Sequence, residues 1–348
     1  MCPNSSLSEE EPPEYPSSDV IQDLLSSLPP LPAALLPQLH DAHCHPTDHP
    51  QTLSQIDTTA RGSLCAMSTR PDDQSLVESF AADNPDTVVP FFGYHPWFAH
   101  LFSIDDENHY ESIFKPTPSQ DFIAHLPKPI PWDRALKDLR ERLETNPKAQ
   151  VGEIGLDKSF RLPTHINGQR DVAARKDLSP YRTTPTHQLR IFTDQCRLAA
   201  QLGRSISVHG VQCHGTLFTT LQSLWHPTPK NTPTQAPAYP PRICIHSASL
   251  PIDTLKQYLH PSVPAKVYFS FSTVINARYG QKLLDLIAAV PADKILIESD
   301  WHSEGSIRRS QLVDMARLVI HVKQWTAEQG VKQLEQNFRD FVHGNDQR

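Results

Sequence analysis

The sequence predicts an α/β protein built as a (β/α)8 TIM barrel, with loop insertions and a flexible N-terminal tail. Short runs rich in Val, Ile and Phe alternate with longer amphipathic segments from residue 38 onward. Strands that alternate with helices run parallel, because each helix carries the chain back to the start of the next strand. Eight repeats of this unit favour a closed barrel over an open sheet, and 348 residues suffice for a barrel of about 250 residues with additional segments.

The expected elements follow one another along the chain. Each expected strand is a short apolar run, and each expected helix has apolar residues at helical spacing. The expected strands cover residues 38–43, 62–67, 87–93, 150–154, 205–208, 242–245, 266–271 and 294–298. The expected helices cover residues 72–82, 132–144, 187–202, 215–224, 252–258, 278–289 and 307–326.

Residues 1–36 are predicted to be a tail outside the barrel domain, which is expected to span residues 37–343. The tail is rich in Pro, Ser and Glu, a composition that buries little apolar surface. Its one apolar segment, residues 20–28, is able to form a helical turn or two against the body. Three more segments are too long for ordinary connections, namely residues 102–131, 158–185 and 225–241. The first two follow strands and are expected at the barrel mouth, whereas the third follows a helix and is expected on the opposite face.

Composition limits the class of function and the compartment. The formal net charge of −7 argues against a basic coat over the whole surface, although a local basic patch would still bind phosphate. The 6 cysteines are scattered without a C-x-x-C pair, which is typical of reduced thiols. The N-terminus lacks the basic start and apolar core of a secretion signal, and no stretch reaches the roughly eighteen apolar residues that span a bilayer. We therefore expect a cytoplasmic and/or nuclear protein with no membrane partner.

Two histidines near the first expected strand have the spacing of metal ligands. In an extended strand, residues two apart point to the same side, so His43 and His45 present their imidazoles together while Cys44 faces away. Neutral imidazole is the commonest metal ligand. The chain has 18 histidines, so one such pair also arises by chance, and one pair is only half a site.

More polar residues fall at the carboxyl ends of other expected strands, which converge on one mouth in a barrel. A lone strand-end histidine more often satisfies a backbone hydrogen bond, and a lone glutamate more often forms a salt bridge. Several separate strands delivering metal-type side chains at one level are harder to attribute to chance. Four imidazoles and two carboxylates suffice for two divalent ions that share a bridging carboxylate. The predicted ligands are His43, His45, Glu153, His209, His246 and Asp300.

This arrangement resembles the TatD family of metal-dependent hydrolases, within the wider amidohydrolase-like barrels. The matching segments run in family order from residue 38 to about 343, and the end of the chain, with Asn337, Phe338 and Phe341, is similar to the family's last helix. The resemblance implies metal ligands at the six residues above, with Glu153 bridging and His95 near the scissile phosphate. It also implies phosphodiester hydrolysis of the deoxyribonuclease type, with DNA as substrate. The segments are DAHCH (41–45), GYHPW (93–97), VGEIGLD (151–157), SVH (207–209), ICIH (243–246), YFSFS (268–272) and ILIESD (295–300).

The chain departs from the TatD pattern at two places. The family usually carries an arginine able to hold a phosphate two residues after the fifth-strand histidine, and here Val211 stands there. After His246 the family continues with Cys-Phe-Ser-Gly, whereas residues 247–250 are Ser-Ala-Ser-Leu. The acidic tail and long insertions resemble a fungal branch described as interacting with a subunit of the anaphase-promoting complex. This implies a protein partner bound through the tail or the insertions.

The predicted catalytic residues are Asp300, Glu153 and His95. Two metals would lower the pKa of a bound water and offset charge in the transition state, and Asp300 is expected to orient or deprotonate that water. Histidine-rich ligands favour zinc or manganese over magnesium, but the sequence leaves the metal open. Trp97 and Phe98 are expected either to stack a base or to pack under the insertion. A phosphate-attracting rim, or simply a solvated loop, is predicted from Lys158, Arg161, Arg170, Arg175, Lys176, Arg182 and Arg190.

Two other functions stay open at this point. Hydrolysis of a small cyclic amide or a phosphotriester also suits an H-x-H barrel, but such relatives commonly carry a modified lysine where Glu153 stands. A scaffold without turnover is supported by Val211 and the Pro-rich segments, and opposed by the intact six-ligand set. Among the other histidines, His302 is expected to touch the site, whereas His40, His187 and His214 are expected to be ordinary surface or supporting residues.

Overall fold

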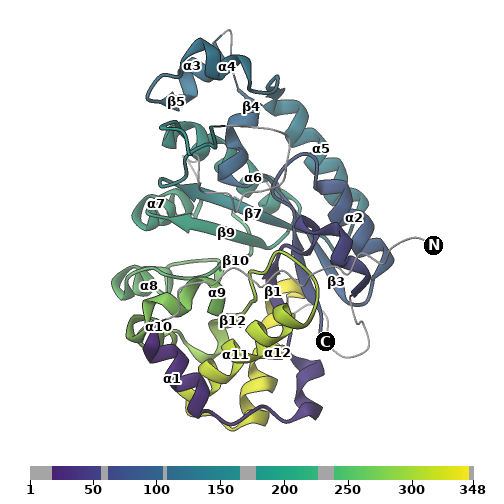
Figure 1. Ribbon diagram of the computed structural model, residues 1–348, viewed down its shortest axis with the longest axis vertical. Coiled ribbons are helices and arrows are strands. Elements are labelled where there is room, and N and C mark those ends of the chain that lie inside the picture. The colour runs from purple at the N-terminus through teal and green to yellow at the C-terminus, as the bar shows by residue number, and fades with distance from the viewer. Residues whose placement is uncertain (1–17, 56–61, 105–107, 165–177, 226–238, 345–348) are drawn as a thin grey trace, which may run out of the picture.

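The computed structural model describes residues 18–55, 62–104, 108–164, 178–225 and 239–344. Eight parallel strands form one sheet in chain order (Figure 1). The amides of Asp300 and His45 donate to the carbonyls of His43 and Trp301 at 3.0 and 2.8 Å, which places the segment after the last strand beside the first. The sheet is therefore a nearly closed barrel, and the predicted fold class is confirmed. Its strands are β1 Asp41–Cys44, β2 Leu64–Met67, β3 Val88–Phe92, β7 Gln150–Asp157, β9 Ile206–Val211, β10 Arg242–Ile245, β11 Lys266–Phe271 and β12 Ile295–Ile297.

Helices alternate with these strands and lie around the barrel, as Figure 1 shows. The helices are α1 Asp19–Ser27, α2 Gln74–Asp83, α3 His109–Ile113, α4 Gln120–Ala124, α5 Trp132–Thr145, α6 Pro185–Gln201, α7 His214–Trp225, α8 Ile252–Tyr258, α9 Thr273–Asn276, α10 Gln281–Ala289, α11 Ser306–Val322 and α12 Ala327–His343. Short 3-10 turns are η1 Ala33–Gln38, η2 Pro46–Asp48, η3 Pro50–Gln55, η4 Pro96–Leu101, η5 Ala277–Tyr279 and η6 Ala292–Lys294. Among the described residues, every helix is too short or too polar to cross a membrane.

Several predicted boundaries are wrong by a few residues. The first strand begins at Asp41 rather than at residue 38, because residues 33–38 form the turn η1 with Pro37 inside it. The predicted helix over residues 307–326 ends at Val322. A new helix, α12, then begins at a capping box in which Thr326 and Gln329 satisfy each other's backbone N–H groups.

The fourth and fifth strands are longer than predicted, and this matters for the site. The strand expected over residues 150–154 continues as β7 to Asp157, and the strand expected over 205–208 continues as β9 to Val211. Pairing persists between Gly155 and His209 and ends with Asp157 opposite Val211. The two strands therefore carry the polar residues of their carboxyl ends in one rigid ladder.

The segment before β1 packs on the barrel. Of the predicted tail, residues 1–17 lie outside the described residues, whereas the apolar segment over 20–28 forms α1, laid on the body as the sequence allows. Helix α1 lies beside α11 (Figure 1). Ile21 of α1 is fully buried, and Arg317 of α11 donates to the carbonyls of Leu25, Leu28 and Pro29. Residues 18–36 are thus part of the packed body rather than a free tail.

Helix α12 closes the end of the barrel opposite the mouth. Its residues Phe338, Phe341 and Val342 share one buried apolar cluster with interior strand residues such as Phe91 and Tyr268. Asn337 donates to the carbonyls of Ala292 and Ile295 at 2.7 and 2.8 Å. This end is therefore filled with apolar side chains, and polar chemistry is concentrated at the mouth.

The first two insertions join into one lobe over the mouth. The first contains α3, α4 and the short strands β4 Phe102–Ser103, β5 Phe114–Lys115 and β6 Ile130–Pro131. From the second insertion, β8 Arg182–Thr183 pairs with β5, and Leu162 joins a small apolar core with Tyr110 and Phe114. The lobe stands at the top of Figure 1. Residues 165–177 of the second insertion, and 226–238 of the third, lie outside the described residues.

Candidate metal centre

The long β7–β9 ladder brings two of the predicted site residues into contact. Glu153 and His209 point toward each other, and His209 Nδ1 lies 2.8 Å from Glu153 Oε1. Gly155 makes this approach possible, since its φ is +154° and a Cβ there would overlap the carbonyl of His209. The close packing of these two strands therefore sets the position of the imidazole.

Glu153 is the centre of the polar cluster, and its two oxygens face different groups. Oε2 lies 3.4 Å from His43 Nε2 and 3.2 Å from His45 Nε2. These two nitrogens are 3.1 Å apart. Asp300 Oδ1 lies 3.7 and 3.6 Å from the same nitrogens. Together with Glu153 Oε2 itself, four potential metal-ligand atoms converge on this side of the carboxylate.

The other oxygen of Glu153 faces a second set of imidazoles. Oε1 lies 2.7 Å from His246 Nε2, 2.8 Å from His209 Nδ1 and 3.2 Å from His95 Nε2. Glu153 is only 3% exposed. The carboxylate thus lies between two groups of nitrogen donors, one on each oxygen. All six predicted ligands, and His95, lie in this single cluster.

Asp300 and Ser247 adopt uncommon backbone conformations beside the cluster. Asp300 has φ +50° and Ser247, directly after His246, has φ +39°. Ser247 Oγ lies 3.4 Å from Asp300 Oδ2. Non-glycine residues with positive φ carry backbone strain, and such residues gather at functional sites. Here the conformation turns the Asp300 carboxylate toward the histidines.

Outer partners fix the rings of three imidazoles. His43 Nδ1 lies 2.8 Å from Ser207 Oγ, and His209 Nε2 lies 3.3 Å from Asp157 Oδ2. Trp97 Nε1 donates to the same Asp157 oxygen at 2.7 Å. Partners of this kind on the far ring nitrogen orient metal-binding histidines and set their tautomers. They leave His43 Nε2 and His209 Nδ1 free to face Glu153.

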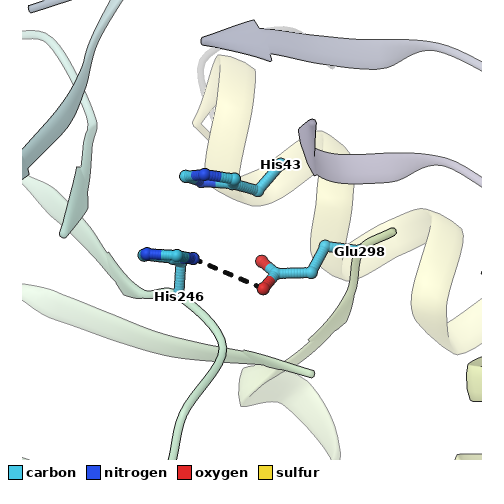
Figure 2. A group of neighbouring side chains, drawn as sticks. All are labelled: His43, His246 and Glu298. Atoms are coloured by element: carbon cyan, nitrogen blue, oxygen red, sulfur yellow. Dashed lines mark ion pairs between the residues drawn. The ribbon is translucent and has the colours of Figure 1, made fainter. Parts of the chain in front are cut away.

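The third ring, that of His246, lies in ion-pair distance of Glu298, as Figure 2 shows. The rings of His43 and His246 are stacked with centroids 4.0 Å apart, and His246 Nδ1 lies 3.5 Å from Glu298 Oε1. Glu298 is fully buried, and its oxygens already accept from Ser247 N, Ser247 Oγ and Ser270 Oγ. Although His43, His246 and Glu298 are close enough to surround an ion, the Glu298 carboxylate already accepts these three hydrogen bonds. Its position fits support of His246 better than direct ligation.

His95 differs from the other imidazoles. Its Nδ1 accepts a hydrogen bond from Trp97 N at 3.1 Å, so in the neutral ring Nε2 carries the proton and donates to Glu153. Burial lowers the pKa of His95 to about 4, which keeps the ring neutral near pH 7. His95 is therefore arranged as a hydrogen-bond donor to Glu153 while its ring is neutral.

The electrostatics of the cluster fit a cation. Burial alone would raise the pKa of Glu153, but His95, His246 and His43 hold it well below its usual range. Burial alone would likewise lower the pKa of His45, yet hydrogen bonds to Asp300 and Glu153 carry it well above the usual value. Positive charge is thus supplied by protons on buried imidazoles. A divalent ion would supply the same charge and bind the nitrogen lone pairs, so the donor set suits a metal.

Comparison with known proteins agrees with this geometry. The family described as TatD related DNase matches residues 40–343. The chain belongs to this family. The predicted resemblance and the predicted class, a metal-dependent hydrolase that acts on ester bonds, are therefore confirmed.

Individual TatD relatives span nearly the whole chain. Cut9-interacting protein scn1 of Schizosaccharomyces pombe is 38% identical over 333 residues, which cover 87% of this chain and 98% of that protein. The uncharacterized deoxyribonuclease YMR262W of Saccharomyces cerevisiae is 29% identical over 328 residues, covering 88% and 99%. The crystal structure of YJJV, a TatD homolog from Escherichia coli, has a TM-score of 0.59 at 17% identity and covers 88% of this chain and 98% of that one. This last likeness shows the shared fold.

The aromatic residues at the mouth of this TatD barrel pack against neighbouring side chains. Trp97 stacks on Phe160 of the lobe with centroids 4.9 Å apart, and Phe98 lies under the guanidinium of Arg70 at 5.5 Å. The structure therefore shows the packing role that the sequence left as one of two options. His302 stacks on His45 at 5.2 Å, so it touches the site as expected.

The predicted basic rim is described only in part. Lys158 Nζ donates to Thr216 Oγ1 at 3.1 Å, and Arg190 pairs with Asp194 on its own helix at 2.7 Å. Arg161 and Arg182 are among the described residues of the lobe, whereas Arg170, Arg175 and Lys176 lie outside the described part of the chain.

Sequence reasoning missed the residues that support the ligands. Ser207 precedes His209 by two positions in an extended strand, so the alternation of side chains could have placed it at the mouth. Asp157 and Glu298 lie in segments that resemble the family, but the sequence alone predicted no function for either residue. The sequence did not indicate a role for Asp48 or Arg70, because their contact depends on the loops that follow two different strands.

Proposed function

We propose that this TatD protein is a phosphodiesterase of the deoxyribonuclease type that uses two divalent metal ions, one on each side of Glu153. The observation that carries the proposal is the division of the cluster between the two oxygens of this carboxylate. His43, His45 and Asp300 would hold one ion with Oε2, and His209 and His246 would hold the other with Oε1. Bound divalent ions lower the pKa of water and offset negative charge on phosphate oxygens.

Asp300 and His95 have complementary proposed roles in proton handling. Burial would raise the pKa of Asp300, but hydrogen bonding with His45 and nearby histidines hold it below its usual range, so the carboxylate is ionised. It is the proposed acceptor of the proton of the attacking water. The neutral His95 is the proposed donor to a phosphate oxygen, through the Nε2 proton that now points at Glu153.

The substrate class is proposed from the family. The family description and the S. cerevisiae relative both name deoxyribonuclease activity, which supports a DNA substrate. The nitrogen-rich donor set supports zinc or manganese, with magnesium as a weaker candidate. The glutamate at the fourth strand supports phosphodiester hydrolysis over the amide or phosphotriester chemistry of related barrels.

A protein partner is a further part of the proposal. The S. pombe relative is named for its interaction with Cut9, which supports a partner bound through residues 1–36 or the lobe. We also propose that the protein works in the cytoplasm and/or nucleus, in accord with five described cysteines that are free and buried. Binding of the purified Cut9 homologue to the full chain and to a chain lacking residues 1–17 tests the partner, and no binding to either rejects it.

The activity is tested by metal content together with cleavage of single- and double-stranded DNA. We expect two equivalents of metal by elemental analysis, and cleavage that chelator abolishes and manganese, zinc or magnesium restores. Asp300→Asn should abolish cleavage with folding kept, whereas the exposed Asp253→Asn is the matched control. Bound metal without cleavage by the wild-type protein would reject the nuclease proposal, and absence of metal would reject the site.

A further inference from the structure

Arg70 is a buried arginine at the mouth of the barrel, just outside the cluster around Glu153. It follows β2, and the two residues before it are bonded to the site. Ser68 O accepts from Glu153 N at 3.0 Å, and Thr69 O accepts from His95 N at 2.8 Å. Arg70 therefore directly follows the two residues whose carbonyls bind the backbone of Glu153 and His95, two of the proposed catalytic residues.

The side chain of Arg70 lies between the segments that follow β1 and β3. Its Nη2 is 3.5 Å from Asp48 Oδ1 at the end of η2, and its guanidinium is 5.5 Å from the ring centre of Phe98 in η4. Its Nε pairs with Asp72 at 2.9 Å, but the Asp72 side chain is 62% exposed. Arg70 itself is 6% exposed. Buried charges of this kind are costly unless they are paired and hydrogen-bonded.

One donor of this guanidinium, Nη2, has an ion-pair neighbour in Asp48 but no hydrogen-bond partner among the described residues. Nη2 is buried and makes no hydrogen bond within the described part of the chain. Its neighbour Asp48 is already engaged through the other oxygen, which lies 2.7 Å from His302 Nδ1. Arginine presents its N–H groups in a planar fork that matches phosphate oxygens. Nη2 is thus a buried donor that an incoming anion can satisfy.

The same contacts set the distance between Arg70 and the cluster. Asp48 joins Arg70 to His302, and the His302 ring is stacked on His45 with centroids 5.2 Å apart. Arg70 is therefore two residues removed from the nearest proposed ligand. An anion held by Arg70 lies beside the reacting phosphate rather than at it.

We propose that Arg70 binds the phosphate adjacent to the scissile one in a nucleic-acid substrate. This rests on the proposed phosphodiesterase function and adds a second phosphate contact to it. Asp48 and Phe98 act as positioning residues, since one pairs with the guanidinium and the other lies against its face. Arg70 is then a determinant of substrate length, because only a substrate with a neighbouring phosphate can use it.

Steady-state hydrolysis of two single-stranded substrates separates this role from a structural one. A dinucleotide has one phosphodiester, and a trinucleotide has a second next to it. Arg70→Met should raise KM for the trinucleotide about tenfold and leave both kcat and the dinucleotide KM within about twofold. Arg70→Lys should give a smaller rise, since it keeps the charge and loses the fork. The matched control is Arg339→Met, which removes an exposed arginine paired with Glu335 on α12.

Salt dependence gives a second readout that a structural role does not move. The slope of log KM against log salt for the trinucleotide should become shallower by about 0.7 in Arg70→Met, as expected for one lost contact to single-stranded phosphate. Fluorescence anisotropy with a phosphorothioate trinucleotide should show the same loss of affinity without turnover. Thermal unfolding of each variant checks that the fold is intact.

The outcomes distinguish the two proposals. If the wild-type protein cleaves neither substrate, the phosphodiesterase proposal fails, and anisotropy alone decides whether Arg70 binds phosphate. If the wild-type cleaves both and Arg70→Met changes neither KM, or changes both equally, the Arg70 proposal is overturned. If Arg70→Met does not fold, Arg70→Lys decides, because a rise in KM confined to the trinucleotide supports the contact and unchanged kinetics reject it.

Discussion

Two buried charged clusters lie close together in this barrel and are built differently. In one, Arg308 is 1% exposed and pairs with Asp41 at 2.6 Å and with Glu304 at 2.7 Å. Ser299 N and Oγ complete the shell of Asp41 at 2.9 and 2.7 Å. In the other, Glu153 faces imidazole nitrogens on both oxygens, and the positive charge comes from groups that titrate.

The difference teaches which cluster is structural and which is a candidate metal centre. A guanidinium is a permanent cation that belongs to the chain, so the Arg308 cluster is complete in the folded protein alone. Imidazoles that direct a ring proton at a carboxylate can lose that proton and bind a metal ion with the same nitrogen. The clusters are linked, since Asp41 precedes His43 by two residues and Ser299 precedes Asp300 by one. The Arg308 cluster therefore holds in place the two segments that carry ligands.

Removing the central carboxylate should disrupt the cluster around Glu153 and spare the Arg308 cluster. Glu153→Gln deletes the charge that both groups of nitrogens share, and we expect DNA cleavage to fall by about 10,000-fold, equivalent to about 5.4 kcal/mol of transition-state stabilisation. Cleavage rates with saturating manganese measure the effect. Unfolding of the metal-free protein should stay cooperative, and a variant that retains one-tenth of the activity would contradict the central role of Glu153.

Removing the permanent cation should have the opposite effect. Arg308→Met leaves Asp41 and Glu304 buried without their partner, which typically costs about 3–5 kcal/mol. Denaturant unfolding of metal-free wild-type and variant proteins measures the loss, with the exposed Arg339→Met as control. An unchanged free energy of unfolding would show that the Arg308 cluster is not structural.

Removing a partner on the outside of the cluster around Glu153 should have an intermediate effect. Asp157→Asn weakens the hold on His209 Nε2, although Trp97 can still donate to the amide oxygen. Loss of such outer partners typically lowers metal affinity 10–100-fold, and we expect this range for metal release by competing chelator. Asp121→Asn on the lobe helix α4 serves as the matched control. Equal metal affinity in Asp157→Asn and wild type would remove Asp157 from the site.

The imidazole of His40, which packs on helix α12, sharpens the contrast through pH. His40 stacks on Phe338, accepts from Ser63 N, and has a pKa that burial lowers from 6.5 to about 4. The unfolded chain therefore takes up this proton first, and the stability due to neutral His40 is present above pH 6.5 and lost as the pH falls toward 4. When the pH is lowered from 7.5 to 5.5, the free energy of unfolding of the metal-free wild type should fall by about 1 kcal/mol more than that of His40→Gln. Urea unfolding measures both values, and an equal fall in the free energy of unfolding for the two proteins would contradict this prediction.

The sequence was sufficient to predict the barrel and to predict that the six candidate ligands lie together, because both depend on local patterns. His43 and His45 share a strand face, and Glu153, His209, His246 and Asp300 mark the ends of apolar runs. Other features depend on contacts between distant segments. Strand β5 pairs with β8, and Arg70 contacts Asp48, although these residues are far apart in the chain. No periodic pattern in the sequence predicts either contact.

The same distinction explains the N-terminal segment and the strand ends. The apolar face of residues 20–28 indicated a possible helix, but only packing against α11 shows that α1 belongs to the body. The extension of β7 and β9 past apolar residues into Gly, Asp and His reflects pairing between the strands, which no propensity of the individual residues predicts.

Anomalous diffraction from manganese-soaked crystals of the full chain is the most direct test of the shared carboxylate. We predict two peaks, one beside His43 and His45 and the other beside His209 and His246, with the two oxygens of Glu153 directed to different peaks. A single peak, or two peaks that both lie away from Glu153, would contradict the two-metal centre and with it the proposed division of the site.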